Sequence, residues 1–123
     1  MTKDLSFKRE RDNLRILISH CNSIENAISR FGHGIDDFAE NTIFQYSCAF
    51  SVQQIGDTIR RIPSKLKNKH PEIDWKELFE LGEAILYNYD RIGIPDLWKT
   101  ITEKVPKLKK QCSPILILLE AKL

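Results

Sequence analysis

The residues DWKELFELGEAILYNYD (74–90) form the most strongly patterned segment of the chain. Their apolar members recur at steps of three and four, the spacing that places side chains on one face of an α-helix. This face comprises Trp75, Leu78, Phe79, Gly82, Ile85, Leu86 and Tyr89. We therefore predict a helix with one buried face, in which Gly82 leaves a notch and from which Tyr87 and Asn88 are excluded.

Both ends of this helix carry sequence signals. Asp74 precedes Glu77 by three residues, which is the spacing of a capping box with an acidic cap. After the helix, a connection over residues 91–95 ends in Pro95, and proline suits the first turn of a helix. We therefore predict a second, shorter helix over residues 96–101, joined to the first by a tight turn.

Two longer helices are predicted before this pair. An apolar stripe with helical spacing runs from about residue 5 to residue 31, where two glycines end it. A second stripe runs over residues 42–62 and ends at Pro63, and it is widened by Ile43, Tyr46, Ala49 and Phe50. A helix that is apolar on more than one side packs against more than one partner, here the first helix and either another segment or another subunit.

Two residues near these helices have specific structural roles in the prediction. Gly56 lies inside the second helix, where glycine costs about 1 kcal/mol relative to alanine. Close approach of another backbone is the usual reason for that cost. Residues 33–41 form a linker with a single helical turn, and its Phe38 is predicted to close the end of the helix pair.

The remaining segments are shorter. Residues 64–73 form a basic connection that contains Lys65, Lys67, Lys69 and His70. It is either a phosphate-contacting segment or a solvated loop, and the lack of an interleaved aromatic residue favours the loop. Pro106 is predicted to begin a last segment that Pro114 breaks. The apolar run at 115–119 is then either a terminal turn folded onto the bundle or part of a dimer contact.

Composition limits the classes of protein that remain. The predicted fold class is all-α: one domain over residues 1–123, with four main helices in an up-down bundle and a short C-terminal segment. The net charge of +2 is too small to indicate a nucleic-acid binder, and no window has the ~18 apolar residues of a membrane span. Three widely spaced cysteines fit neither a zinc nor a disulfide pattern, which favours the reducing cytoplasm. No metal, cofactor or catalytic constellation is predicted from these patterns.

A longer pattern carries a family resemblance. The residues IGDTIRRI (55–62), followed by HPEIDWKEL (70–78), resemble the HepT-like family of the HEPN superfamily. That family typically shows Ile-Gly-Glu-Ala before a basic pair, and then His-Pro-Glu-Ile-Pro-Trp. Trp98 and the residues VPKL (105–108) match its C-terminal pattern, so the similarity spans about residues 55–111.

The resemblance implies a fold, an assembly and an activity. HepT-like proteins are small helical homodimers, and many are ribonuclease toxins of toxin–antitoxin systems, encoded beside a minimal nucleotidyltransferase antitoxin. Their third helix carries an Arg, a polar residue, a short gap, a His, one residue and a Tyr. The Arg and His of both subunits form a metal-independent site for RNA cleavage, in which His moves a proton and Arg stabilises phosphate charge. The antitoxin blocks the toxin by adding AMP to the Tyr.

This sequence departs from that signature. Aligned through the two tryptophans, the Arg position is Gly82, the following polar position is Glu83 and the His position is Tyr87, while the Tyr position is kept as Tyr89. Gly82 has no side chain to hold a phosphate, and tyrosine, with a reference pKa near ~10, is a poor proton shuttle at neutral pH. Glu83 adds negative charge where an RNA phosphate would lie. Tyr89 is the candidate for modification.

Four other residues are candidates for RNA or phosphate contacts, namely Arg60, Arg61, His70 and Arg91. The sequence therefore predicts a HepT-like homodimer that serves as a non-catalytic binding or regulatory partner of a minimal nucleotidyltransferase. The alternative is an RNA endonuclease toxin with an atypical active site.

Overall fold

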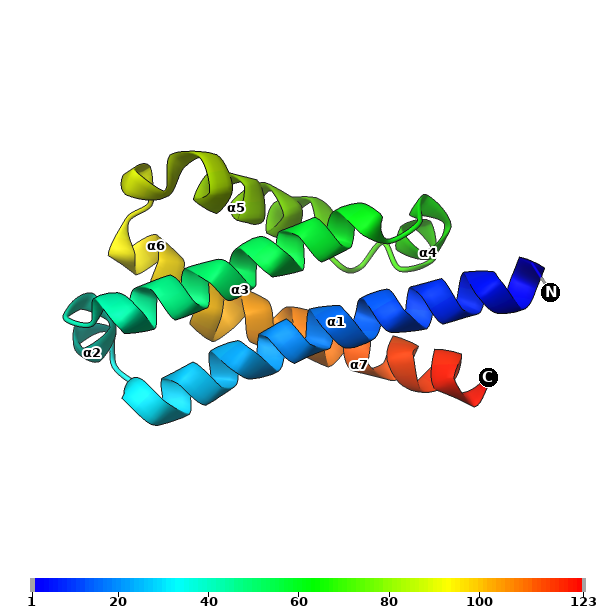
Figure 1. Cartoon of the computed structure of the whole chain (residues 1–123), viewed down its shortest axis with the longest axis horizontal. Coiled ribbons are helices and arrows are strands. Elements are labelled where there is room, and N and C mark those ends of the chain that lie inside the picture. The colour runs from blue at the N-terminus through cyan, green and yellow to red at the C-terminus, as the bar shows by residue number, and fades with distance from the viewer. Residues whose placement is uncertain (1, 123) are drawn as a thin grey trace.

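A computed structural model describes residues 2–122, with side chains from Leu5 onward. The predicted all-α fold is confirmed, and the described residues form no strand. Four long helices run up and down along one axis (Figure 1). They are α1 (Thr2–Phe31), α3 (Thr42–Arg61), α5 (Trp75–Asn88) and α7 (Val105–Ala121).

Shorter elements connect the long helices. They are α2 (Ile35–Ala39), α4 (Ser64–Lys69), a 3₁₀ turn (Tyr89–Arg91), α6 (Ile94–Lys99) and a π-helical turn (Thr100–Lys104). The main packing contacts join α3 to α5, α1 to α3, and α1 to α7. The helix α3 is therefore central, with α1 on one side and α5 on another, as its wide apolar arc predicts.

An aromatic cluster closes the bundle at the α2 end. The Phe38 ring lies 4.9 Å from the Phe44 ring and 5.2 Å from the Trp98 ring, measured between ring centroids. Phe38 and Phe44 have no exposed surface. The prediction that Phe38 closes the end of the helix pair is confirmed.

The helix ends follow from local chemistry. The Asp74 carboxylate accepts a hydrogen bond from the backbone N–H of Glu77 at 3.0 Å, so the predicted cap of α5 is present. At the other end of the preceding long helix, Ile62 is extended with a ψ of 128°. An extended conformation is what the residue before a proline favours, and Pro63 thus ends α3 as predicted.

The connection after Pro63 differs from the prediction of a loop. Residues 64–69 form the helix α4, because the carbonyl of Pro63 accepts hydrogen bonds from Leu66 and Lys67 and the Leu66 side chain is buried. Pro63 is a suitable residue just before a helix because its own N–H is not needed there. The lysine-rich composition predicted a solvated loop because only one residue of this segment, Leu66, has a buried apolar side chain.

The C-terminal part also corrects the prediction. The π-helical turn joins α6 directly to α7, so Pro106 does not begin a separate segment, and α7 passes through Pro114 without a break. The wide turn lies just before Pro106, whose ring would crowd a regular α-helical turn. Pro114 is exposed, and so is Lys110, whose carbonyl has no N–H at Pro114 to accept a hydrogen bond from.

Gly56 of α3 and Gly82 of α5 face one another where the two helices approach. A Cβ atom added to Gly56 would lie 3.0 Å from the Cα of Gly82 and 3.3 Å from the carbonyl oxygens of Leu78 and Phe79. A Cβ added to Gly82 would meet the Cα of Gly56 at 3.0 Å and the carbonyl oxygen of Val52 at 3.3 Å. The backbone approach that Gly56 predicted is confirmed, and the notch at Gly82 is the other half of it.

We expect Gly56→Ala and Gly82→Ala each to lower the free energy of unfolding, by up to about 2 kcal/mol. Overpacking against backbone atoms costs roughly 1–3 kcal/mol, while the better helix propensity of alanine returns only about 1 kcal/mol. Urea denaturation followed by circular dichroism measures the change. The control is Gly93→Ala, whose added Cβ would meet nothing nearer than 3.7 Å. Two glycine variants as stable as the wild type would contradict the proposed steric limit.

Candidate functional site

A groove of about 460 Å³ lies between α3 and α5. Its lining comprises Gln53, Gln54, Asp57, Arg60, Phe79, Gly82, Glu83, Leu86 and Tyr87. Three of the degenerate motif positions, Gly82, Glu83 and Tyr87, therefore share one surface with Arg60. Sequence reasoning did not select Gln53 and Asp57, although each lies on the helix face that carries Arg60, at steps of four and three.

The position that the family fills with arginine forms the base of this groove. Gly82 is buried and lies against Gly56, so its α-carbon is part of the contact between the two helices. An arginine side chain at this position would first have to place a Cβ atom 3.0 Å from the backbone of α3. Any side chain at position 82 would therefore affect the packing of α3 on α5.

The charges in the groove are unfavourable for a phosphate. Arg60 donates to the Asp57 carboxylate at 2.9 Å through its Nη2 and at 3.2 Å through its Nε, and Arg61 pairs with the other carboxylate oxygen. These hydrogen bonds hold the pKa of Asp57 below its ordinary value, so it is ionised at neutral pH. Glu83 adds a second carboxylate, and the one guanidinium in the lining already has an acidic partner.

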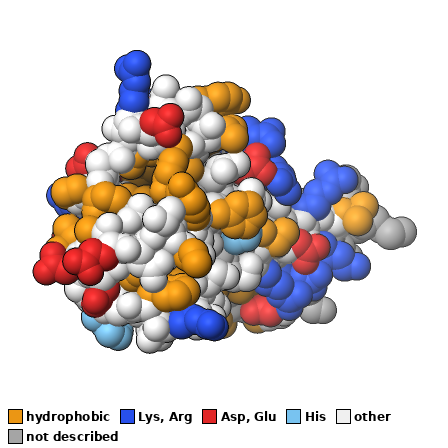
Figure 2. Space-filling model, turned by 60° about the vertical axis from the view of Figure 1, so that its left-hand side comes forward, with side chains coloured by type: hydrophobic (Ala, Val, Ile, Leu, Met, Phe, Trp, Pro, Cys, Tyr) orange, Lys and Arg blue, Asp and Glu red, His pale blue; other side chains and the backbone are white. Residues whose placement is uncertain are grey.

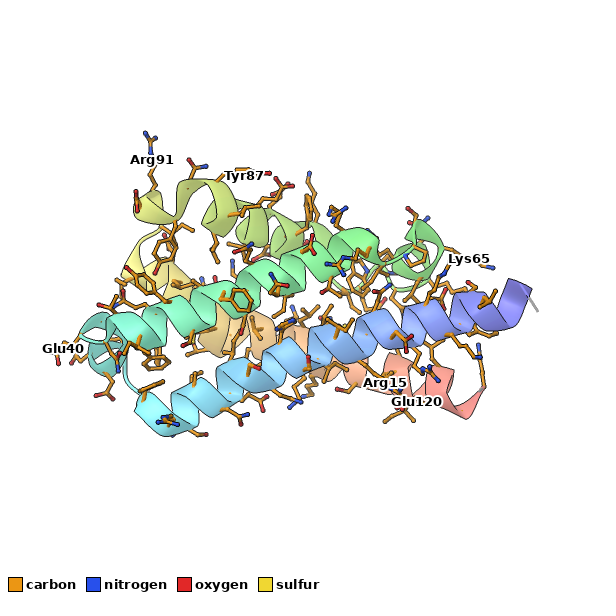
Figure 3. All side chains as sticks on the ribbon, viewed as in Figure 1. Arg15, Glu40, Lys65, Tyr87, Arg91 and Glu120 are labelled. Atoms are coloured by element: carbon orange, nitrogen blue, oxygen red, sulfur yellow. The ribbon has the colours of Figure 1, made fainter. Side chains whose placement is uncertain are left out.

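The groove lining differs from the family pattern in the residue expected to move a proton. None of the residues that line it is a histidine. Tyr87 is 71% exposed and projects from the outer side of α5 (Figure 3).

The other predicted site residues lie outside the groove. His70 follows α4, and its Nδ1 lies 3.3 Å from the Glu72 carboxylate. Arg91 extends away from the bundle at the end of α5 (Figure 3) and lines a separate hollow beside α6. Neither His70 nor Arg91 is among the residues that line the groove, so the structure does not bring them to the motif positions.

Tyr89 begins the 3₁₀ turn after α5 and is partly buried. Its ring lies 5.7 Å from the ring of Tyr46 on α3. Burial, together with the nearby Tyr46 and Asp90, raises the pKa of the Tyr89 phenol, which is therefore protonated at neutral pH. Tyr89 and Tyr87 thus differ in environment, since one packs against α3 and the other is largely solvated.

An exposed apolar surface adjoins the groove, and we call it the α3–α5 face. It comprises Ile43, Tyr46, Phe50, Leu86 and Tyr87, each more than half exposed. Leu86 was predicted on the buried face of its helix, and that prediction is wrong. The helix α3 covers only the side of α5 that faces it, and Leu86 lies outside that contact. Figure 2 shows hydrophobic side chains on the end of the bundle that carries this face, and Lys and Arg side chains gathered toward the far end.

Cysteine and metal chemistry are not located in this groove. Burial raises the pKa of each of the three thiols, Cys21, Cys48 and Cys112, to about 12, so they stay protonated at neutral pH. Over the part of the chain that the structure describes, no three His, Cys, Asp or Glu side chains are placed to hold a metal ion. In the same residues, no helix is both long and apolar enough to cross a membrane.

The all-α bundle is consistent with a HEPN-like fold. The family model described as ribonuclease HepT-like matches residues 18–115, and the chain belongs to this family. The predicted family is thereby confirmed. No solved structure is similar enough to be matched with significance.

Curated relatives come from three organisms. "Putative RNase MJ1380" of Methanocaldococcus jannaschii is 32% identical over 88 residues, which cover 70% of this chain and 81% of the relative. "Probable ribonuclease HepT" of Thermococcus cleftensis is 31% identical over 74 residues, covering 60% and 67% respectively. "Putative RNase TTE0752" of Caldanaerobacter subterraneus is 24% identical over 109 residues, covering 89% and 96%.

Proposed function

We propose that this chain is a non-catalytic HepT-like homodimer that serves as a binding or regulatory partner of a minimal nucleotidyltransferase in a toxin–antitoxin type system. The observation that carries the proposal is that Gly82, at the position of the family's arginine, has no side chain and is buried against Gly56, so the groove has no cation at this position. Tyr87 in place of histidine and the acidic Glu83 support the same conclusion. A groove with these residues lacks both a free cation for phosphate and a proton shuttle.

The proposed dimer uses the α3–α5 face. Monomeric proteins rarely expose a contiguous apolar patch of several large side chains, and a patch of this kind marks an interaction surface. Leu86 and Tyr87 belong both to this face and to the lining of the groove. A second copy on the face would therefore bring its own groove beside the first.

The proposed contact with the nucleotidyltransferase is at Tyr89. Its position matches the family's modified tyrosine, and its ring lies at the edge of the α3–α5 face beside Tyr46. Because its phenol is protonated at neutral pH, the transferase would have to supply the base that activates it. The names of the relatives support the alternative function, an RNA endonuclease with an atypical site.

We expect the α3–α5 face to hold the dimer together. Light scattering at micromolar concentration should give about twice the chain mass of 14.3 kDa. Phe50→Glu should shift the mass to that of one chain, since a buried charge without a partner is strongly unfavourable at an apolar contact. The matched control is Ile117→Glu, at an equally exposed position on α7. A wild-type protein that is monomeric would overturn the proposed dimer.

We expect the purified protein not to cleave RNA above background. Loss of the proton shuttle is commonly worth ~10²–10⁴-fold and loss of one stabilising donor ~10²–10³-fold, although the two effects need not multiply. The measurement is incubation with total RNA and with transfer RNA, beside His70→Ala and Arg91→Ala variants. Robust cleavage that either variant abolishes would replace the proposal with the endonuclease alternative.

We expect a cognate nucleotidyltransferase with ATP to add AMP to Tyr89 and not to Tyr87. The two residues are separated by one position, so Tyr87→Phe is a matched control for Tyr89→Phe. Intact mass and peptide mapping locate the modification. Transfer that persists in Tyr89→Phe but disappears in Tyr87→Phe would contradict the assignment. So would the absence of transfer by a transferase shown to be active on another substrate.

A further inference from the structure

A second hollow, of about 860 Å³, lies between the end of α3, the helix α4 and the start of α5. We call it the α4 hollow. Four cationic side chains line it, namely Arg60, Lys67, Lys76 and Lys107, and they come from α3, α4, α5 and α7. Pockets for small ligands span roughly 300–1,000 Å³, so this volume suits a molecule larger than an inorganic ion.

The α4 hollow has an excess of positive charge. Its lining holds two carboxylates against the four cations: Glu72, 3.3 Å from the His70 ring, and Asp74, which caps α5. Within residues 5–122, neither Lys67 nor Lys107 lies within ion-pair distance of a carboxylate. These two ammonium groups are therefore the cations most available to an anionic ligand.

The position of Lys67 is fixed by the fold. Its Nζ donates to the backbone carbonyl of Ile59 at 3.1 Å, which holds the ammonium over the end of α3 and leaves its remaining N–H donors free for a ligand. Lys107 lies on the first turns of α7, across the hollow from α4. Two cations on separate elements, one of them already positioned, are a suitable arrangement for a phosphate group.

An aromatic surface lies beside these cations. Phe79 is partly exposed and lines both the α4 hollow and the groove between α3 and α5. Trp75 also lines the hollow, and its indole N–H donates to the carbonyl of His70 at 3.1 Å, which fixes the ring in place. Nucleic-acid bases stack on exposed aromatic rings, and this contact is tolerant of sequence.

We propose that the α4 hollow binds a nucleoside phosphate, with Lys67 and Lys107 contacting the phosphate and the base lying against Phe79. The ligand is either a free nucleotide or a nucleotide unit of a single-stranded RNA, which present the same chemistry. This site is distinct from the degenerate motif, because Gly82, Glu83 and Tyr87 do not line it. The proposal does not depend on the absence of catalysis.

The test is titration of the purified full chain with AMP and with hexaadenylate RNA by isothermal calorimetry at low salt. We expect saturable binding, with Lys107→Gln and Lys67→Gln each weakening it about tenfold, since each removes one charge-assisted contact. Phe79→Leu should also weaken binding severalfold through loss of stacking. The matched control is Lys110→Gln, an exposed residue on the same helix that does not line the hollow, and it should change binding less than twofold.

The two probes distinguish the source of the ligand. Hexaadenylate that binds at least tenfold more tightly than AMP indicates an RNA strand, and equal or weaker binding indicates a free nucleotide. Failure of both probes to bind at millimolar concentration would overturn the proposal. An equal effect of Lys110→Gln and Lys107→Gln would also overturn it, because binding would then follow overall charge. Circular dichroism confirms that each variant is folded, and RNA cleavage is measured separately, so this result is independent of the proposed function.

Discussion

The contact between Gly56 and Gly82 is the constraint on which the arrangement of α3 and α5 depends. Two helices pack backbone to backbone only where neither has a Cβ atom in the way, and here a Cβ added to either glycine would lie 3.0 Å from the Cα of the other. This approach sets the distance between the helices and therefore the depth of the groove above them. The central helix α3 is in turn packed against α1, so a change in the glycine contact would be transmitted to the core.

The contact between Gly56 and Gly82 bears both on the stability of the bundle and on the proposed function. Under the proposed function, the position of the family's arginine is Gly82, which is here part of the helix interface. An arginine at residue 82 would place a Cβ atom 3.0 Å from the Cα of Gly56, so the neighbouring backbone would have to shift by a few tenths of an ångström. The proposal therefore links the loss of the cation to the packing of α3 on α5.

The sequence was sufficient for features that are encoded locally. Helical spacing located α1, α3 and α5, the cap at Asp74 was found from three residues, and Gly56 indicated the close approach. Prediction from the sequence failed for features that depend on contacts between helices. The helix α4 depends on burial of Leu66, α7 continues through Pro114 on an exposed side of the helix, and the exposure of Leu86 depends on which side of α5 faces α3. The groove itself could be anticipated only in part, since its lining requires the pairing of α3 with α5.

The groove and the α4 hollow adjoin one another but differ in their charged residues. Arg60 and Phe79 line both the groove and the α4 hollow. On the groove side, the Arg60 guanidinium is neutralised by Asp57, and Glu83 adds a further negative charge. On the other side, Lys67 and Lys107 contribute charge without a carboxylate partner among residues 5–122. An anionic ligand that reached Phe79 would meet these two ammonium groups on the α4 side and the Asp57 and Glu83 carboxylates on the groove side. The proposed phosphate site therefore lies beside α4 and adjoins the groove at Phe79.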